Sequence, residues 1–237
     1  MRWLLVAFLF IATAARGAEP VDVALALVSD VSRSIDDSEF DLQKKGYSAA
    51  FTDPQVLAAI KGGAVGAIAV TYIEFASSYE VTKIIDWTVI KDDASAKAFV
   101  DKLVAAPRSA YGRTAIGSGV EMAMKSIDAS GFETQRKVID VCGDGTNNNG
   151  PDVGSVRDSA VAEGMTINGL AIINDHPVSW TYAHVQPPGG LPNWYRENVT
   201  GGNGSFVLEV HDFKTFGEAM TRKLVNEIAD AGTARPF

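Results

Sequence analysis

The chain has 237 residues and is acidic, with 21 lysines and arginines against 29 aspartates and glutamates and a formal net charge of −8. A protein that binds nucleic acid through its phosphates needs a basic surface, so this composition argues against that class. Hydrophobic residues make up 46% of the chain and charged residues 21%, as in a folded globular protein. The length suits one large domain.

The N-terminus has the pattern of a secretory signal peptide. Arg2 is followed by an apolar run from Leu4 to Ala12, and the small residues over 12–15 suit cleavage. The run is shorter than the roughly 20 apolar residues that cross a bilayer, and no later run reaches that length. We therefore expect residues 1–18 to be a signal peptide, cut between Ala14 and Ala18. Residues 19–237 would then form a single exported domain without a membrane span, periplasmic or extracellular and bacterial in origin.

The first half of the chain predicts a strand, a helix and a hairpin. Residues 21–28 are nearly all apolar, which is typical of a strand buried on both faces of a parallel sheet. A helix is predicted to open at Asp36, because Glu39 follows three residues later as in a capping box. Two β-rich runs, 64–75 and 79–89, are separated by three residues and predict an antiparallel hairpin.

The remaining elements alternate more regularly. We expect a helix from Asp92, a helix after Thr114, a strand over 137–142, a helix over 152–163, strands over 165–173 and 205–210, and a helix over 212–229. This alternation predicts an α/β fold with a doubly wound, mostly parallel central sheet, helices on both faces and one antiparallel edge hairpin. The connection at about 174–204 is long and rich in aromatic residues and proline, and we interpret it as a recognition or capping loop.

Polar side chains follow the predicted strands. Ligands of open α/β sheets bind at the carboxyl ends of the strands, where loops from different strands meet. Hydroxyl and carboxylate oxygens, without histidine or thiolate, favour a hard cation such as Mg²⁺, Ca²⁺ or Mn²⁺ over zinc or copper. The sequence therefore predicts a divalent cation site at this edge, made from Asp30, Ser32, Ser34, Thr114 and Asp144.

Three motifs carry a resemblance to a known family. Asp-Val-Ser-Arg-Ser at 30–34, Gly-Arg-Thr-Ala-Ile-Gly at 112–117 and Gly-Asp-Gly at 143–145 occur in this order. They resemble the metal-ion-dependent adhesion site (MIDAS) of the von Willebrand factor type A (VWA) family. The secreted form and the segment Gly143–Gly150 further resemble a bacterial exported VWA-like subgroup of unknown function. Each motif alone would also suit a helix cap or a turn.

The resemblance implies a role for each of these residues. Ser32 and Ser34 would bind the cation through their hydroxyls, Thr114 directly or through water, and Asp30 and Asp144 mostly through water or as acceptors behind the ligands. We expect Mg²⁺, with Ca²⁺ and Mn²⁺ as alternatives. An acidic residue of a protein partner would complete the coordination. The resemblance thus implies a binding module that recognises an exposed acidic group.

An enzyme is the alternative, because an open cation site can activate water for hydrolysis. Such a metal-dependent hydrolase needs a general base within reach, and the candidates are Glu74, Asp140, Asp175 and His176. None lies in a catalytic motif, so we predict a protein that is not an enzyme. Asp140 stands in an apolar run and must be paired if it is buried. The only cysteine, Cys142, is interpreted as a buried side chain of the same strand, so no internal disulfide forms.

Overall fold

A computed structural model describes residues 18–173, 186–211 and 215–229. The predicted signal peptide therefore lies outside the described residues, apart from its last position. Within the described part, no helix is both long and apolar enough to cross a membrane.

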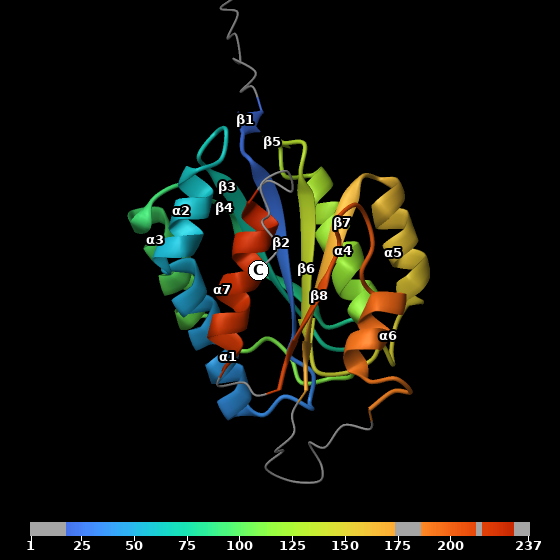
Figure 1. The fold of residues 1–237 in the computed structure, drawn as a ribbon. Coiled ribbons are helices and arrows are strands. Elements are labelled where there is room, and N and C mark those ends of the chain that lie inside the picture. The colour runs from blue at the N-terminus through green and yellow to red at the C-terminus, as the bar shows by residue number, and fades with distance from the viewer. Residues whose placement is uncertain (1–17, 174–185, 212–214, 230–237) are drawn as a thin grey trace, which may run out of the picture.

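A six-stranded sheet forms the middle layer (Figure 1). Its strands are β2 (Val23–Asp30), β3 (Ile68–Phe75), β4 (Val81–Ile90), β6 (Lys137–Gly143), β7 (Met165–Ile172) and β8 (Val207–Val210), in the order β4-β3-β2-β6-β7-β8. Only β4 and β3 pair antiparallel, and the other neighbours are parallel. This confirms the predicted sheet with its edge hairpin. Two short strands, β1 (Glu19–Pro20) and β5 (Phe132–Glu133), form a separate parallel pair.

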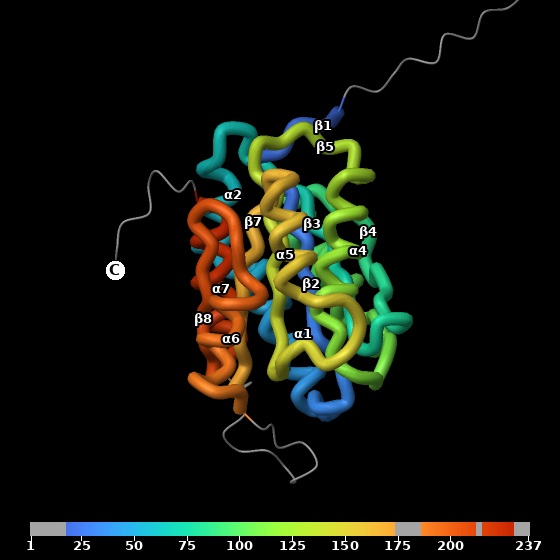
Figure 2. The backbone as a smooth tube through the Cα atoms, turned by 90° about the vertical axis from the view of Figure 1, so that its right-hand side faces the viewer, coloured from blue at the N-terminus to red at the C-terminus, as the bar shows by residue number. Residues whose placement is uncertain are grey.

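Helices cover both faces of the sheet, as predicted (Figures 1 and 2). One face carries α1 (Asp37–Phe51), α2 (Pro54–Lys61), α3 (Asp93–Ala105) and α7 (Phe216–Ile228). The other carries α4 (Ile116–Asp128), α5 (Val153–Ala162) and α6 (Leu191–Asn198). All eight side chains of β2 are buried, alternately against the two helical layers, which explains the nearly continuous apolar run.

Two helices differ from the sequence prediction. The helix α2 begins with Pro54 at its first position, after Asp53, whose side chain accepts a hydrogen bond from the Gln55 N–H. The helix α6 lies inside the connection 174–204, for which the sequence predicts one long loop. Its buried Leu191 and Tyr195 recur at helical spacing and pack on the sheet. Residues 174–185 of this connection, Trp180 among them, lie outside the described residues.

The helices α1 and α7 pack closely because Gly46 has no side chain. A Cβ atom at this position would collide with the ring of Phe216. That ring is fully buried and stands edge-on to Tyr47, with the ring centroids 5.3 Å apart. The terminal helix is therefore docked through its apolar stripe, as its spacing predicts; Phe213 lies outside the described residues.

Truncation of Phe216 tests this packing. Phe216→Ala should lower the free energy of unfolding by about 3–5 kcal/mol, because it leaves a cavity between α1 and α7. Urea denaturation of the variant and the parent protein measures the change. Tyr79→Ala is the matched control, since that ring is 85% exposed and its loss should cost about 0.5 kcal/mol or less. A similar small loss for Phe216→Ala would contradict the docking.

Asp140 has a buried partner on α7. Its Oδ1 lies 2.7 Å from Nζ of Lys223, which also pairs with Glu227 one turn further along the helix. Asn168 donates a hydrogen bond of 2.9 Å from Nδ2 to Oε1 of Glu227. All four side chains are buried, so one lysine stands between two carboxylates with no bulk water around them. Burial raises the pKa of Glu227 to about 7 and also raises that of Asp140.

This buried cluster predicts a dependence of stability on pH. The pKa of Glu227 rises from an ordinary 4.5 to about 7 on folding, so the folded state holds a proton that the unfolded state has lost between these values. The stabilisation is therefore complete below pH 4.5 and lost as pH rises through 7, by as much as roughly 3 kcal/mol. Glu227→Gln should remove this part of the pH dependence between pH 5 and 8, as measured by urea denaturation.

Glu218→Gln provides the comparison, because Glu218 is an exposed carboxylate of the same helix. It should leave the slope of unfolding free energy against pH unchanged. An unchanged slope in Glu227→Gln as well would show that Glu227 is ionised throughout this range.

Candidate metal centre

The candidate site lies where the strand order reverses. The strand β2 pairs with β3 on one side and with β6 on the other, and Ser29 is in register with Cys142. Asp30 and Asp144 therefore leave the sheet side by side at its carboxyl edge. The third loop reaches the same edge just before α4, where the Arg33 N–H donates to the Gly112 carbonyl over 3.0 Å. Ligands of doubly wound sheets bind at such a switch point.

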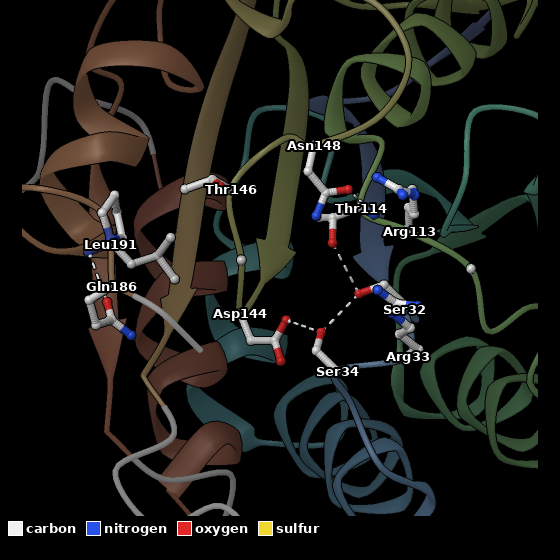
Figure 3. Close-up of a pocket in the computed structure, with 13 residues that line it drawn as sticks. Ser32, Arg33, Ser34, Arg113, Thr114, Asp144, Thr146, Asn148, Gln186 and Leu191 are labelled. Atoms are coloured by element: carbon white, nitrogen blue, oxygen red, sulfur yellow. Dashed lines mark hydrogen bonds between the residues drawn. The ribbon is translucent and has the colours of Figure 1, made fainter. Parts of the chain in front are cut away.

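Four of the predicted site residues are joined by hydrogen bonds. The hydroxyl of Ser34 donates to Oδ1 of Asp144 over 3.0 Å, and it lies 3.0 Å from the Ser32 hydroxyl. The Thr114 hydroxyl donates to the Ser32 hydroxyl over 3.3 Å. Figure 3 shows this row of oxygens, with Ser34 between Asp144 and Ser32. Side chains from three separate loops thus present their oxygens together.

Asp30 holds the main chain of Ser32, one of the residues in this row, in place. Its side chain is fully buried, and its Oδ1 accepts a hydrogen bond of 2.7 Å from the Ser32 N–H. This contact fixes the backbone of the first loop where the chain leaves β2. The structure therefore brings together all five residues that the sequence predicts, with Asp30 in the position that holds Ser32.

The spacing of these oxygens suits a small hard cation. In an octahedral shell with ligands at 2.0–2.1 Å, as for Mg²⁺, neighbouring oxygens lie about 2.9 Å apart. The Ser32–Ser34 and Ser34–Asp144 separations are both 3.0 Å. Within the described residues, no group of three or more His, Cys, Asp and Glu side chains gathers as a metal site. The donor set here is mostly hydroxyl, which fits Mg²⁺ better than a soft metal.

Three consecutive asparagines hold the Asp144 loop against its neighbours. Asn148 accepts from the Thr114 N–H through its side chain, at 3.0 Å, and donates its own N–H to the Thr114 carbonyl at 2.9 Å. Asn147 accepts from the Gly117 N–H and Asn149 from the Ser78 N–H. These bonds position Thr114 beside the serines without adding charge to the site. The sequence shows the asparagines as a conspicuous run, but it does not show what they contact.

Arg108 fixes the loop that carries the serines. Its Nη2 donates to the carbonyl oxygens of Val31 and Ser32, each at 2.8 Å, and its side chain is 4% exposed. The guanidinium also lies over the Tyr111 ring, 4.1 Å from its centroid. No motif in the sequence marks this arginine, because its partners are carbonyl groups of the main chain.

Tyr195 of α6 packs in the core behind the site, against the end of β6. Its ring is fully buried, and a Cβ at Gly143 would lie 2.8 Å from the Tyr195 oxygen and 3.0 Å from Oδ2 of Asp30. Glycine at position 143 is thus required for the hydroxyl to approach the strand end. Burial, and then the nearby Asp30 carboxylate, raises the pKa of Tyr195 well above its ordinary value. This contact depends on α6, which the sequence did not reveal.

The hydroxyls and Asp144 line an open cavity of about 420 Å³. Arg33 and Arg113 stand at its rim, and Gln186 and Leu191 lie across from the hydroxyls (Figure 3). Pro187 also lines the cavity. Among the described residues that line the cavity, Asp144 is the only carboxylate and there is no histidine.

Of the candidate general bases for a hydrolase, the two that the structure describes do not line the cavity. Glu74 is buried and accepts a hydrogen bond of 2.8 Å from the Ser109 N–H, and burial raises its pKa. Asp140 is engaged with Lys223 in the core. Asp175 and His176 lie outside the described residues. No observation on the described residues therefore favours a hydrolase.

Solved structures share this architecture at low sequence identity. A structure of PTMP1, proximal thread matrix protein 1 from the mussel byssus, described as having a zinc-occupied MIDAS motif, has 17% identity and a TM-score of 0.65 over 89% of this chain and 48% of its own. A von Willebrand factor type A structure from Catenulispora acidiphila has 16% identity and a TM-score of 0.60, over 89% of this chain and 43% of its own. The pilus adhesin SpaC from Lactobacillus rhamnosus GG has 14% identity and a TM-score of 0.57, over 89% and 31%.

These comparisons define the class of fold, which is that of a VWA domain. The chain spans less than half the length of each of these three proteins. No curated protein sequence matches it. The chain belongs to the family described as "Protein of unknown function (DUF1194)", whose model matches residues 20–232. The resemblance to a VWA-like family of unknown function is thereby confirmed.

Proposed function

We propose that this protein is an exported VWA-type binding module that holds a divalent cation and, through it, binds an acidic group of a protein partner. The observation that carries the proposal is the row of hydroxyl and carboxylate oxygens from three loops, spaced about 3 Å apart in the wall of an open cavity. Ser32, Ser34 and Thr114 would hold the ion, together with Asp144. Asp30 would act through Ser32. Mg²⁺ is the ion that this donor set suits best.

The charge of the site supports an acidic ligand. When bound, the cation would supply a Lewis-acidic position for a carboxylate. Most of the surrounding oxygens belong to neutral hydroxyls, so its charge would be only partly neutralised. The protein carries a net charge of −8 and would repel acidic partners in general. Local attraction at the cation would then decide where an acidic group can bind.

The structural neighbours support an adhesive role outside the cell. They include a pilus adhesin and a matrix protein of the mussel byssus, and one of them has a zinc-occupied MIDAS motif. We extend the metal-dependent mode of binding to this chain on the basis of its own donor set. Export follows from the predicted signal peptide at residues 1–18.

Metal binding is the first test. Calorimetric titration of the purified protein with Mg²⁺ should show one site, and Mg²⁺ at a hundred-fold excess over its Kd should add about 2.7 kcal/mol to the free energy of unfolding. Ser34→Ala and Asp144→Asn should abolish both effects. The half-buried Ser34 lies outside the core, so Ser34→Ala should change the stability of the metal-free protein by about 1 kcal/mol or less.

The control for this test is Thr146→Ala. Thr146 lines the same cavity, but no hydrogen bond joins it to the row of oxygens among the described residues, so its loss should leave Mg²⁺ binding intact. Unchanged titration in both Ser34→Ala and Asp144→Asn would refute the site.

Partner binding is the second test. Affinity capture from the exported fraction of the source organism should recover a protein in the presence of Mg²⁺ and lose it on addition of a chelator. Capture should survive moderate salt, because a metal–carboxylate bond is short and little screened. Ser34→Ala bait is the matched control and should recover nothing. Capture that is equal with and without chelator would contradict a metal-bridged contact.

A further inference from the structure

Two arginines stand beside the row of oxygens without an assigned role. Arg33 lies between the two serines of the first loop, and Arg113 directly precedes Thr114. Both are exposed and both line the cavity. The hydrogen bond from the Arg33 N–H to the Gly112 carbonyl joins their two loops. The fold therefore places two guanidinium groups at the same rim, on the side of Ser32 and Thr114 (Figure 3).

Neither arginine forms an ion pair or a side-chain hydrogen bond with any described residue, whereas the side chains of three other arginines are engaged. Arg108 binds carbonyl groups and Asp37, Arg136 binds carbonyl groups at the end of α7, and Arg157 pairs with Asp158. Glu80, whose carboxylate lies beside Gly112, accepts a hydrogen bond from the Ser77 N–H at 3.2 Å. In a protein with a net charge of −8, two such arginines at one cavity rim leave a local excess of positive charge.

We infer that the ligand carries two acidic side chains close together: one for the cation position and a second for Arg33 and Arg113. This inference rests on the proposed function and names the class of partner, an acidic peptide segment. Guanidinium groups form paired hydrogen bonds with carboxylates, which suits them to this second contact. The cavity is also lined by Pro187, whose partly exposed ring offers apolar surface to the aliphatic part of a peptide. A bare phosphate would leave that surface uncovered.

Synthetic peptides test the inference with the whole protein. The probes are built on one neutral host peptide, which carries either one glutamate or two glutamates spaced one to four residues apart. In control peptides, glutamine replaces one or the other of the two glutamates. Binding is measured by fluorescence anisotropy in Mg²⁺ at about 0.1 M salt, where the Debye length is about 10 Å. At one of these spacings, the second glutamate should lower the Kd about ten-fold. This is the change expected when the free energies of two exposed ion pairs are added.

Variants of the protein then show which residues are responsible for the tighter binding of the two-glutamate peptide. Arg33→Ala with Arg113→Ala should abolish the ten-fold gain, whereas Mg²⁺ titration should still show one site and single-glutamate peptides should still bind in a metal-dependent way. Arg222→Ala is the matched control, because Arg222 is an exposed arginine of α7 without a described ion pair and lies away from the cavity. Near 1 M salt, where the Debye length is about 3 Å, the gain from the second glutamate should disappear and the metal-dependent part should persist.

The outcomes separate this inference from the proposed function. Loss of Mg²⁺ binding altogether would overturn the proposed function and the inference with it. Metal-dependent binding of single-glutamate peptides with no gain from a second glutamate would overturn the inference alone. The inference is likewise overturned if the gain survives in the double arginine variant, if no peptide binds, or if inorganic phosphate binds with the affinity of the two-glutamate peptide.

Discussion

Backbone hydrogen bonding between β2 and β6 determines where the loops of the site can meet. These two strands are far apart in the sequence but adjacent in the sheet, parallel, and in register from Ala24 and Lys137 onward. Because these two strands run in the same direction, the loops that carry Asp30 and Asp144 leave the sheet at the same edge. A shift of this register by one residue would turn the side chains of one strand to the opposite face and separate Asp144 from the Ser34 hydroxyl.

The groups that hold the site loops in place are mostly neutral, whereas the core beneath α7 contains a cluster of charged side chains. Around the row of oxygens, the loops are braced mostly by neutral groups: asparagine amides, main-chain carbonyls and one buried arginine. Within the α7 layer, by contrast, Asp140 and Glu227 share Lys223 inside the core. A buried ion cluster of this kind contributes little net stability, because desolvation offsets attraction, but it tolerates few alternative arrangements. This cluster joins Lys223 of α7 to Asp140 of β6 at one defined point.

The fold was largely predictable because its strands and most of its helices are defined by local patterns. Continuous apolar runs marked the buried parallel strands, and the capping box at Asp36 marked the start of α1. The helices α2 and α6 were missed because each has only eight residues and depends on tertiary packing. In α6, the glycines and prolines around Leu191 hid the spacing of the residues that it buries.

The candidate site was predictable only in part. Its five oxygen-bearing residues follow strand ends in recognisable motifs, so the sequence was sufficient to group them. The groups that hold them in place act through contacts between distant segments: Arg108 reaches Ser32 across 76 residues and Asn149 reaches Ser78 across 71. The partner of Asp140 was hidden for the same reason. Such contacts depend on topology, which short sequence patterns do not encode.

The two ends of the sheet affect how this protein meets other copies of itself. An edge strand exposes unpaired main-chain groups that can template the addition of another chain. At one edge, β8 has only four residues, which offers a neighbour few hydrogen bonds. At the other, β4 carries Lys83 and Asp86 as an exposed ion pair at 2.5 Å, and a foreign strand docking there would have to desolvate both charges. Both edges therefore disfavour the strand-to-strand pairing from which aggregates and fibres grow.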